Sequence, residues 1–272
     1  MKIFYISDLH FDYNGKESLE KFLGLLNEND IFIILGDFYN DITKTLVIID
    51  LLEHKKVKGY WVLGNHEYIS LFEPANVDPE TKDLLTDEMF SRPSNKTCDK
   101  FLKYVKKRTK HNKYFKFLYN GISYELPNGW KLIGDTGWTS FKNNKDEVAT
   151  DSNLYEWDHV SNWDWVKKQN RKFVKFVNEF IKNNKKTVVV THHPLYLPDV
   201  EKLKNSRFES KKDNEILFWF SKNDIVNKKL HDVKFLHGHT HAESYDENNL
   251  TYAIGRKEHK NELKFKELKL DK

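Results

Sequence analysis

Residues 2–10 have the sequence KIFYISDLH, an apolar segment that ends in an aspartate and a histidine. Two later segments have the same order, IFIILGD at 31–37 and GYWVLGNHE at 59–67. Between them, residues 17–28 and 42–55 carry apolar side chains at helical spacing. Strands that alternate with helices predict parallel strands joined by crossover helices. The sequence therefore predicts an α/β fold.

The alternation stops after residue 67. Residues 70–113 are polar and contain prolines, and we expect a helical insertion or cap there, within one domain that spans 1–272. The Asn120-Gly121 and Asn128-Gly129 pairs predict hairpin turns between three short strands, and so a second, partly antiparallel sheet. The further elements predicted are strands at 115–119, 122–126, 130–135, 187–193 and 233–239, helices at 163–183 and 213–230, a hairpin at 243–254 and an edge strand at 262–270.

Composition excludes several classes of protein. The 272 residues include 45 Lys and Arg against 41 Asp and Glu, and a net charge of +4 is too small to require a nucleic-acid partner. No apolar run approaches the roughly 18–20 residues of a membrane-spanning helix, so we expect no membrane segment. We also expect no signal peptide, and the single Cys98 cannot form an intrachain disulfide, which favours a cytoplasmic location.

Five segments place Asp, Asn and His at the carboxyl ends of predicted strands, where open α/β sheets bind ligands. They are Asp8-Leu9-His10, Gly36-Asp37, Gly64-Asn65-His66-Glu67, Thr191-His192-His193-Pro194 and Gly238-His239-Thr240-His241. In an extended strand end, residues i and i+2 point to the same side, so Asp8 and His10 would face one cavity, as would His239 and His241. The preceding glycines allow tight turns and close approach of the backbone.

One such Asp or His alone would most often be a helix cap or a solvated turn residue. All five segments occur together, however, each after an apolar strand. Clustered carboxylates and imidazoles are metal ligands. The set therefore predicts a metal site.

The segments DLH, GD, GNHE, THHP and HGHTH resemble the calcineurin-like metallophosphoesterase superfamily, in the family's order and over residues 8 to 241. GDTGWTSF at 134–141 is similar to a segment of bacterial and phage members, which is a weaker signal. The resemblance implies a four-layer fold of two packed mixed β-sheets flanked by helices. It also implies a hydrolase of phosphate esters, either phosphatase or phosphodiesterase.

The resemblance implies two metal ions and a set of ligands for each. Asp8, His10 and His241 would hold the first ion, Asn65, His192 and His239 the second, and Asp37 would bridge both. His193 is the alternative to His192, but the family ligand lies two residues before the proline. His237 is expected in the core or behind the ligands.

Carboxylate, imidazole and amide ligands without thiolate suit Mn²⁺, which we expect first, or Fe, Zn or Co. Two such ions activate a bridging hydroxide and stabilise the charge of in-line displacement at phosphorus. His66, beside Asn65, would be the catalytic acid for the leaving group. In the phosphatase branch an Asp three residues after the bridging Asp orients this histidine. Here Asn40 replaces that Asp and Asp41 replaces a phosphate-binding Arg, which disfavours protein Ser/Thr phosphatases.

Two alternatives remain open from the sequence alone. A nuclease that acts on DNA or RNA is suggested by the basic segment Lys96–Lys116 and by the aromatic cluster of Tyr155, Trp157, Trp163 and Trp165, although a solvated helix face and core packing would explain both. A catalytically inactive binding scaffold would have no need for the complete ligand set. The partner that we expect is therefore a phosphate-ester substrate.

Overall fold

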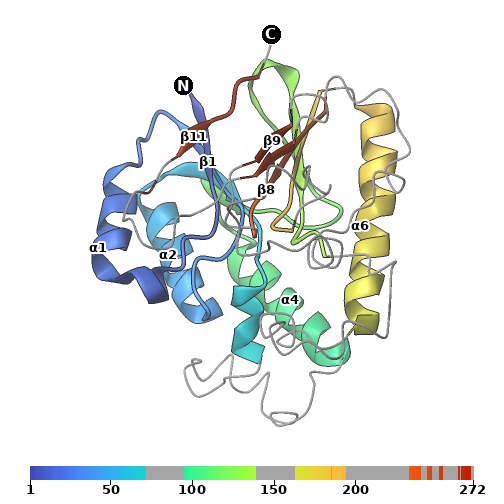
Figure 1. Cartoon of the computed structure of the whole chain (residues 1–272), viewed down its shortest axis with the longest axis horizontal. Coiled ribbons are helices and arrows are strands. Elements are labelled where there is room, and N and C mark those ends of the chain that lie inside the picture. The colour runs from blue at the N-terminus through green and yellow to red at the C-terminus, as the bar shows by residue number, and fades with distance from the viewer. Residues whose placement is uncertain are drawn as a thin grey trace.

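The computed structural model describes residues 1–71, 95–138, 163–184, 186–193, 233–239, 244–246, 251–253, 263 and 265–270. Figure 1 shows two β-sheets between helices, with α1 and α2 on one side and α6 on the other. Within these ranges no helix is both long and apolar enough to span a membrane.

The first sheet has the strand order β11-β1-β2-β3-β4. Strands β1 (Ile3–Ile6), β2 (Ile31–Ile34), β3 (Lys58–Trp61) and β4 (Phe115–Phe117) are parallel, with Ile3 opposite Ile31 and Ile31 opposite Lys58. Strand β11 (Lys266–Glu267) pairs antiparallel with β1 and forms the predicted edge strand.

The second sheet has the order β5-β6-β7-β8-β10-β9. Its four central strands are parallel, namely β6 (Lys131–Gly134), β7 (Thr187–Val190), β8 (Val233–His237) and β10 (Thr251–Ala253). The two edge strands, β5 (Ser123–Glu125) and β9 (Ser244–Asp246), are antiparallel to their neighbours. The predicted hairpin at 243–254 is therefore confirmed as β9 and β10.

Alternate residues of β2 and β7 pack on opposite faces of their sheets. Ile31 and Ile33 of β2 join Val188 and Val190 of β7 in the core between the two sheets. The intervening Phe32 faces the helices of the first sheet. When both faces of a sheet are covered, its strands must be apolar along their whole length. The sequence contains such strands. The predicted fold of two packed mixed sheets flanked by helices is confirmed.

Helices α1 (Phe11–Gly24), α2 (Ile42–His54) and α4 (Asn95–Thr109) cover the outer face of the first sheet. Helix α6 (Trp163–Asn183) covers the second sheet through Phe173, Val177 and Ile181. Two short 3₁₀ helices, η1 (His66–Leu71) and η3 (Pro127–Gly129), follow β3 and β5.

Helix α4 comes from the segment expected to form an insertion or cap. Its Cys98, Phe101 and Val105 side chains are fully or almost fully buried in the core beside the first sheet. This helix therefore belongs to the main packing of the fold. Residues 72–94, the other part of that segment, and the helix predicted at 213–230 lie outside the described residues.

The hairpin predicted at Asn120-Gly121 is wrong. Strand β4 before this turn pairs with β3 in the first sheet, whereas β5 after it pairs with β6 in the second. The turn itself exists, since Gly121 has a φ of 93°, but it carries the chain from one sheet to the other. The turn that contains Asn128-Gly129 does join the antiparallel strands β5 and β6.

Candidate metal centre

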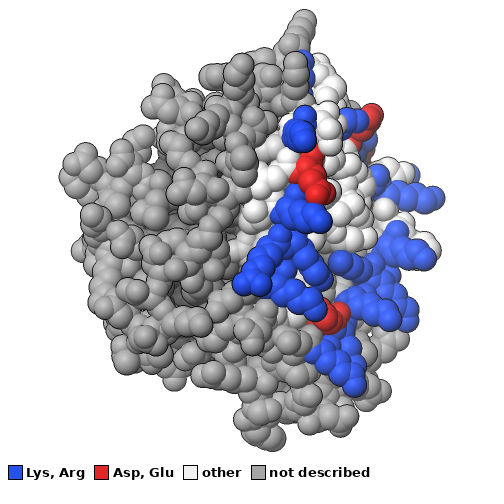
Figure 2. Space-filling model, turned by 90° about the vertical axis from the view of Figure 1, so that its right-hand side faces the viewer, with Lys and Arg blue, Asp and Glu red and all other residues white. Residues whose placement is uncertain are grey.

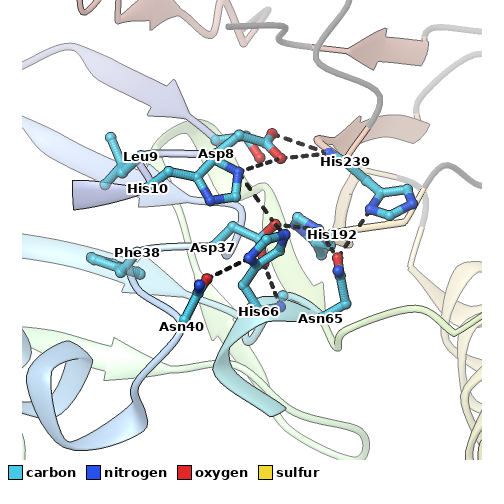
Figure 3. A network of polar contacts seen from close by, with 12 residues as sticks. Asp8, Leu9, His10, Asp37, Phe38, Asn40, Asn65, His66, His192 and His239 are labelled. Atoms are coloured by element: carbon cyan, nitrogen blue, oxygen red, sulfur yellow. Dashed lines mark hydrogen bonds and ion pairs between the residues drawn. The ribbon is translucent and has the colours of Figure 1, made fainter. Parts of the chain in front are cut away.

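The predicted metal ligands come from the carboxyl ends of strands in both sheets. Asp8 and His10 follow β1, Asp37 follows β2, and Asn65 follows β3; His192 and His239 follow β7 and β8 of the second sheet. Figure 3 shows these side chains converging on one region together with His66. All are buried, with at most 5% of each residue exposed. The seventh predicted ligand, His241, lies outside the described residues.

Asp37 lies at the centre of the cluster. Its Oδ2 atom is 3.2 Å from His192 Nε2, 3.7 Å from His10 Nε2 and 3.9 Å from His66 Nε2. Two sets of donor atoms, each within 4.8 Å of one another, share this aspartate: His10, Asp37 and His66 in one, and Asp8, Asp37 and His192 in the other. A carboxylate shared by two donor sets is suited to bridging two cations.

Asn65 links the two histidines from the second sheet. Its Oδ1 atom lies 2.8 Å from His192 Nε2 and 3.0 Å from His239 Nδ1. The backbone N–H of His239 donates to both carboxylate oxygens of Asp8, at 3.2 and 3.0 Å. Oxygen and nitrogen donors without thiolate fit the chemistry of Mn²⁺, Fe, Zn or Co.

Four of these residues have left-handed backbone conformations. Asp8, His10, Asp37 and His239 have φ of 56°, 41°, 57° and 70°, a region that non-glycine residues occupy rarely and at a cost of about 1–3 kcal/mol each. The expected extended i, i+2 arrangement of Asp8 and His10 is therefore wrong, although both side chains reach one site. The turn is fixed by backbone bonds from Asp8 N to Gly36 O at 3.2 Å and from His10 N to Asp37 O at 2.9 Å.

Glycines let the ligand loops approach one another. A Cβ atom on Gly64 would lie 2.0 Å from Asp37 Oδ1, and one on Gly238 would lie 1.6 Å from Ser7 Oγ. Neither position has room for a side chain. The close approach of the backbone expected from the sequence is present at both.

The buried charges shift the pKa values of the cluster in opposite directions. Burial alone would raise the pKa of Asp37, but the charges of His192, His66 and His10 outweigh it and hold the pKa well below its ordinary value. Burial alone would lower the pKa of His192, but the Asp37 carboxylate raises it to about 9. Imidazolium and carboxylate thus compensate each other, as a cation would compensate the carboxylate.

His192 is oriented from behind by the first sheet. Its Nδ1 atom lies 2.7 Å from the carbonyl oxygen of Leu35, which keeps the proton on Nδ1 and turns Nε2 toward Asp37 and Asn65. The ring of His193 instead packs against Trp138, at 5.2 Å between centroids, and burial lowers its pKa to about 3. This geometry favours His192 over His193 as a ligand.

His237 ends β8 behind the ligands. Its side chain is fully buried, and burial lowers its pKa to about 4. The core position expected for His237 agrees with this burial.

Asn40 provides the contact to His66 that the sequence left open. Its Oδ1 atom lies 2.5 Å from His66 Nδ1 (Figure 3). Its Nδ2 atom donates to the hydroxyl oxygen of Tyr13 at 2.9 Å. The backbone N–H of His66 donates to Asp37 Oδ1 at 3.0 Å. His66 is thus fixed from two sides, and its Nε2 faces Asp37. The only sequence signal for Asn40 was its position three residues after Asp37.

Glu67 ends the segment Gly64-Asn65-His66-Glu67, and the sequence alone assigned it no role. Its carboxylate is fully buried and accepts backbone N–H bonds from Asp37 at 3.1 Å, Phe38 at 2.6 Å and Gly64 at 2.7 Å. It therefore joins the loop after β2 to the loop after β3. Burial and the charge of Asp37 raise the pKa of Glu67 to about 7, while the N–H donors stabilise its ionised form.

The aromatic residues suggested as a stacking surface are only partly described. Trp165 is fully buried, packs against Tyr68 and Trp138, and donates from Nε1 to Asp99 at 2.8 Å. It belongs to the core and offers no exposed ring for stacking. Tyr155 and Trp157 lie outside the described residues.

Comparisons with known proteins identify the fold and the family of the chain. The structure is similar to phosphopantetheinyl hydrolase (PptH) from Mycobacterium tuberculosis, with a TM-score of 0.64 and 15% identity over 99% of this chain and 96% of that chain, which shows a shared fold. A cold-active protein tyrosine phosphatase gives a TM-score of 0.37 at 13% identity over 94% and 70% of the chains, too low to carry an argument. The comparison with curated proteins finds no match. A family model for calcineurin-like phosphoesterases matches residues 1–243, and the chain belongs to this family.

Proposed function

We propose that the protein hydrolyses phosphate esters with two divalent metal ions bound by the buried cluster. The family supports metal-dependent phosphoester hydrolysis, and the shared position of Asp37 supports a dinuclear centre. Asp8, His10 and His241 would complete the first site, and Asn65, His192 and His239 the second. Mn²⁺ is the ion that we propose first, with Fe, Zn or Co as alternatives.

The two ions, when bound, would activate a water molecule as the nucleophile and stabilise the charge that develops on the phosphoryl oxygens. The other roles belong to the chain itself. His66 would donate a proton from Nε2 to the leaving-group oxygen, while Asn40 Oδ1, 2.5 Å from Nδ1, holds the ring in place. Glu67 would hold Asp37 and Asn65 in place, because it joins the two loops that carry them.

His66 could instead serve as a metal ligand, since it lies in a donor set with His10 and Asp37. Its contact with Asn40 is compatible with both roles, because an oxygen on Nδ1 leaves Nε2 facing Asp37 in either case. The two roles make different predictions. A catalytic acid can be removed without loss of metal, whereas a ligand cannot.

An inactive scaffold is disfavoured by the cost of the site. A protein that only binds a partner would gain nothing from two buried aspartates, a set of buried histidines and strained backbone at four positions. A cytoplasmic location remains a proposal that rests on the single cysteine.

The experiment is an activity panel of p-nitrophenyl phosphate, bis-p-nitrophenyl phosphate and cyclic nucleotides, measured with Mn²⁺ and with a chelator. We expect hydrolysis that requires the metal and separates monoester from diester preference. His66→Ala should keep its metal content and lose rate mainly on substrates with poor leaving groups, by about 10²–10⁴-fold. Activity that is indifferent to the chelator would contradict the proposal, and loss of metal from His66→Ala would assign that residue as a ligand.

A further inference from the structure

Helices α4 and α6 lie side by side and present many cations to solvent. Figure 2 shows the side of the molecule on which α6 lies, where Lys and Arg side chains dominate the described surface and few acidic side chains interrupt them. We call this surface the basic face and define it by exposed residues of the two helices: Lys100, Lys103, Lys107, Lys168, Arg171 and Lys172.

These cations are not neutralised by the acidic side chains that the structure describes nearby. No member of the basic face forms an ion pair with a described residue, whereas Arg108 pairs with Asp50 at 2.9 Å and Lys175 with Glu179 at 3.9 Å. The charges of the two helices also lie close together. Burial and the neighbouring charge of Lys172 lower the pKa of Lys106 of α4, and the charges of Asp135 and Asp99 oppose this shift only in part.

The basic face begins beside the candidate metal centre. Tyr68, two residues after His66, packs against Phe101 of α4 at 4.9 Å and Trp165 of α6 at 5.9 Å between ring centroids. Trp165 lies in the first turn of α6 and Phe101 in the middle of α4, so α6 begins beside η1 and α4 passes it. The 21 residues of α6 extend for about 30 Å, which is enough for several successive phosphates of a polyanion.

We propose that the basic face binds the phosphate backbone of a single-stranded nucleic acid and leads one of its phosphodiesters to the metal centre. Cations that follow two helices, without an ion pair to any described residue, match a chain of phosphates. A flexible strand can bend toward ligands that are almost fully buried, whereas a rigid duplex cannot. An anionic membrane is disfavoured because the large exposed apolar side chains among the described residues, Met1, Tyr13, Leu25 and Val47, belong to neither α4 nor α6.

Delivery to the metal centre rests on the proposed function, but binding does not. The test therefore measures binding with the metal removed by a chelator, as the fluorescence anisotropy of a labelled oligothymidylate of about 20 nucleotides. The variant replaces Lys103, Lys107, Lys168 and Lys172 with Gln. A matched control replaces four exposed lysines of α1 and α2 and the residue after α2, Lys16, Lys21, Lys44 and Lys55, with Gln.

We expect the first variant to bind the oligonucleotide at least about tenfold more weakly, with a plot of log K against log salt less steep by about 3, since each phosphate contact contributes about 0.7. The control should bind like the parent protein. Equal affinity of both variants, or an equal loss in both, would overturn the proposal. So would binding to phosphatidylserine vesicles without binding to the oligonucleotide.

Activity separates this proposal from the proposed function. The first variant should hydrolyse p-nitrophenyl phosphate at the parental rate, because the small ester does not need the basic face. A parent protein that binds the oligonucleotide but shows no metal-dependent hydrolysis would contradict only the proposed function. A parent protein that hydrolyses the small ester but does not bind the oligonucleotide would contradict only the basic-face proposal.

Discussion

Replacing Glu67 with Gln tests how the two central ligand loops are held together. The carboxylate accepts three backbone N–H bonds, with Oε2 bound to Asp37 and Gly64 and Oε1 bound to Phe38. Gln has the same shape, but one acceptor oxygen becomes an NH₂ group that can only donate. At least one and at most two buried N–H groups therefore lose their acceptor, depending on which oxygen is replaced.

A buried N–H left unsatisfied costs about 2 kcal/mol, the middle of a range of about 1–3, so one or two such groups should cost Glu67→Gln about 2–4 kcal/mol of unfolding free energy. At about 2–4 °C per kcal/mol for a domain of this size, the melting temperature should fall by about 4–16 °C. Glu67→Gln also removes the repulsion between the Glu67 and Asp37 carboxylates. Burial and this repulsion together raise the pKa of Glu67 to about 7. Bound metal ions would cancel the gain from removing this repulsion. The loss of unfolding free energy should therefore be larger in the metal-loaded protein.

Glu53 provides a matched control at the other end of the same sheet. Its carboxylate accepts backbone N–H bonds from Lys113, Tyr114 and Phe115, at 2.7, 2.8 and 2.9 Å. These residues lie at the amino end of β4, opposite the carboxyl ends that carry the ligands. Glu53→Gln should reduce stability without any change in metal affinity.

The assay combines thermal unfolding, with and without Mn²⁺, with a metal titration. Glu67→Gln should lower metal affinity by about 10–100-fold, as expected when a group that holds ligands is lost. The reasoning would be refuted if Glu67→Gln stayed within about 1 kcal/mol of the parent and bound metal normally. It would also be refuted if Glu53→Gln lost as much metal affinity as Glu67→Gln.

Three further pairs of substitutions test the site. Asn40→Ala should lower turnover by about tenfold or more with unchanged metal content, and Asn40→Asp, which keeps an oxygen acceptor, should retain most of the rate; equal losses in both would contradict the orienting role. Asp37→Asn should reduce metal content and turnover more than Asn65→Ala, because it removes a charge shared by two donor sets, and elemental analysis will show which loses more. Gly64→Ala should abolish metal binding because its Cβ would lie 2.0 Å from Asp37 Oδ1, whereas Gly24→Ala, with nothing within 4 Å, should keep full activity.

Local patterns in the sequence predicted most of the fold because both faces of each sheet are buried. The apolar runs at 31–35 and 187–190 form β2 in the first sheet and β7 in the second. In both strands, every other side chain packs between the two sheets. Local patterns do not predict which strands pair with each other, because pairing depends on contacts between residues that are distant in sequence. The Asn120-Gly121 turn forms as expected, but the pairing of β4 with β3 decides that it joins two sheets.

The chemistry of the site was visible in the sequence, and its geometry was not. Asp, Asn and His after apolar strands indicated where ligands gather. The left-handed backbone at Asp8 and His10 depends on hydrogen bonds to the loop after β2, about 30 residues away, so strand alternation alone could not predict it. The same holds for Glu67, which acts on the backbone of Asp37 and Phe38 rather than on a neighbour in sequence.

A crystal structure of the protein loaded with Mn²⁺, with the ions located by anomalous scattering, would show whether two metal ions share Asp37. We expect two peaks about 3.5–4 Å apart, both in contact with the Asp37 carboxylate. A single peak, or two peaks of which one lies away from Asp37, would contradict this expectation.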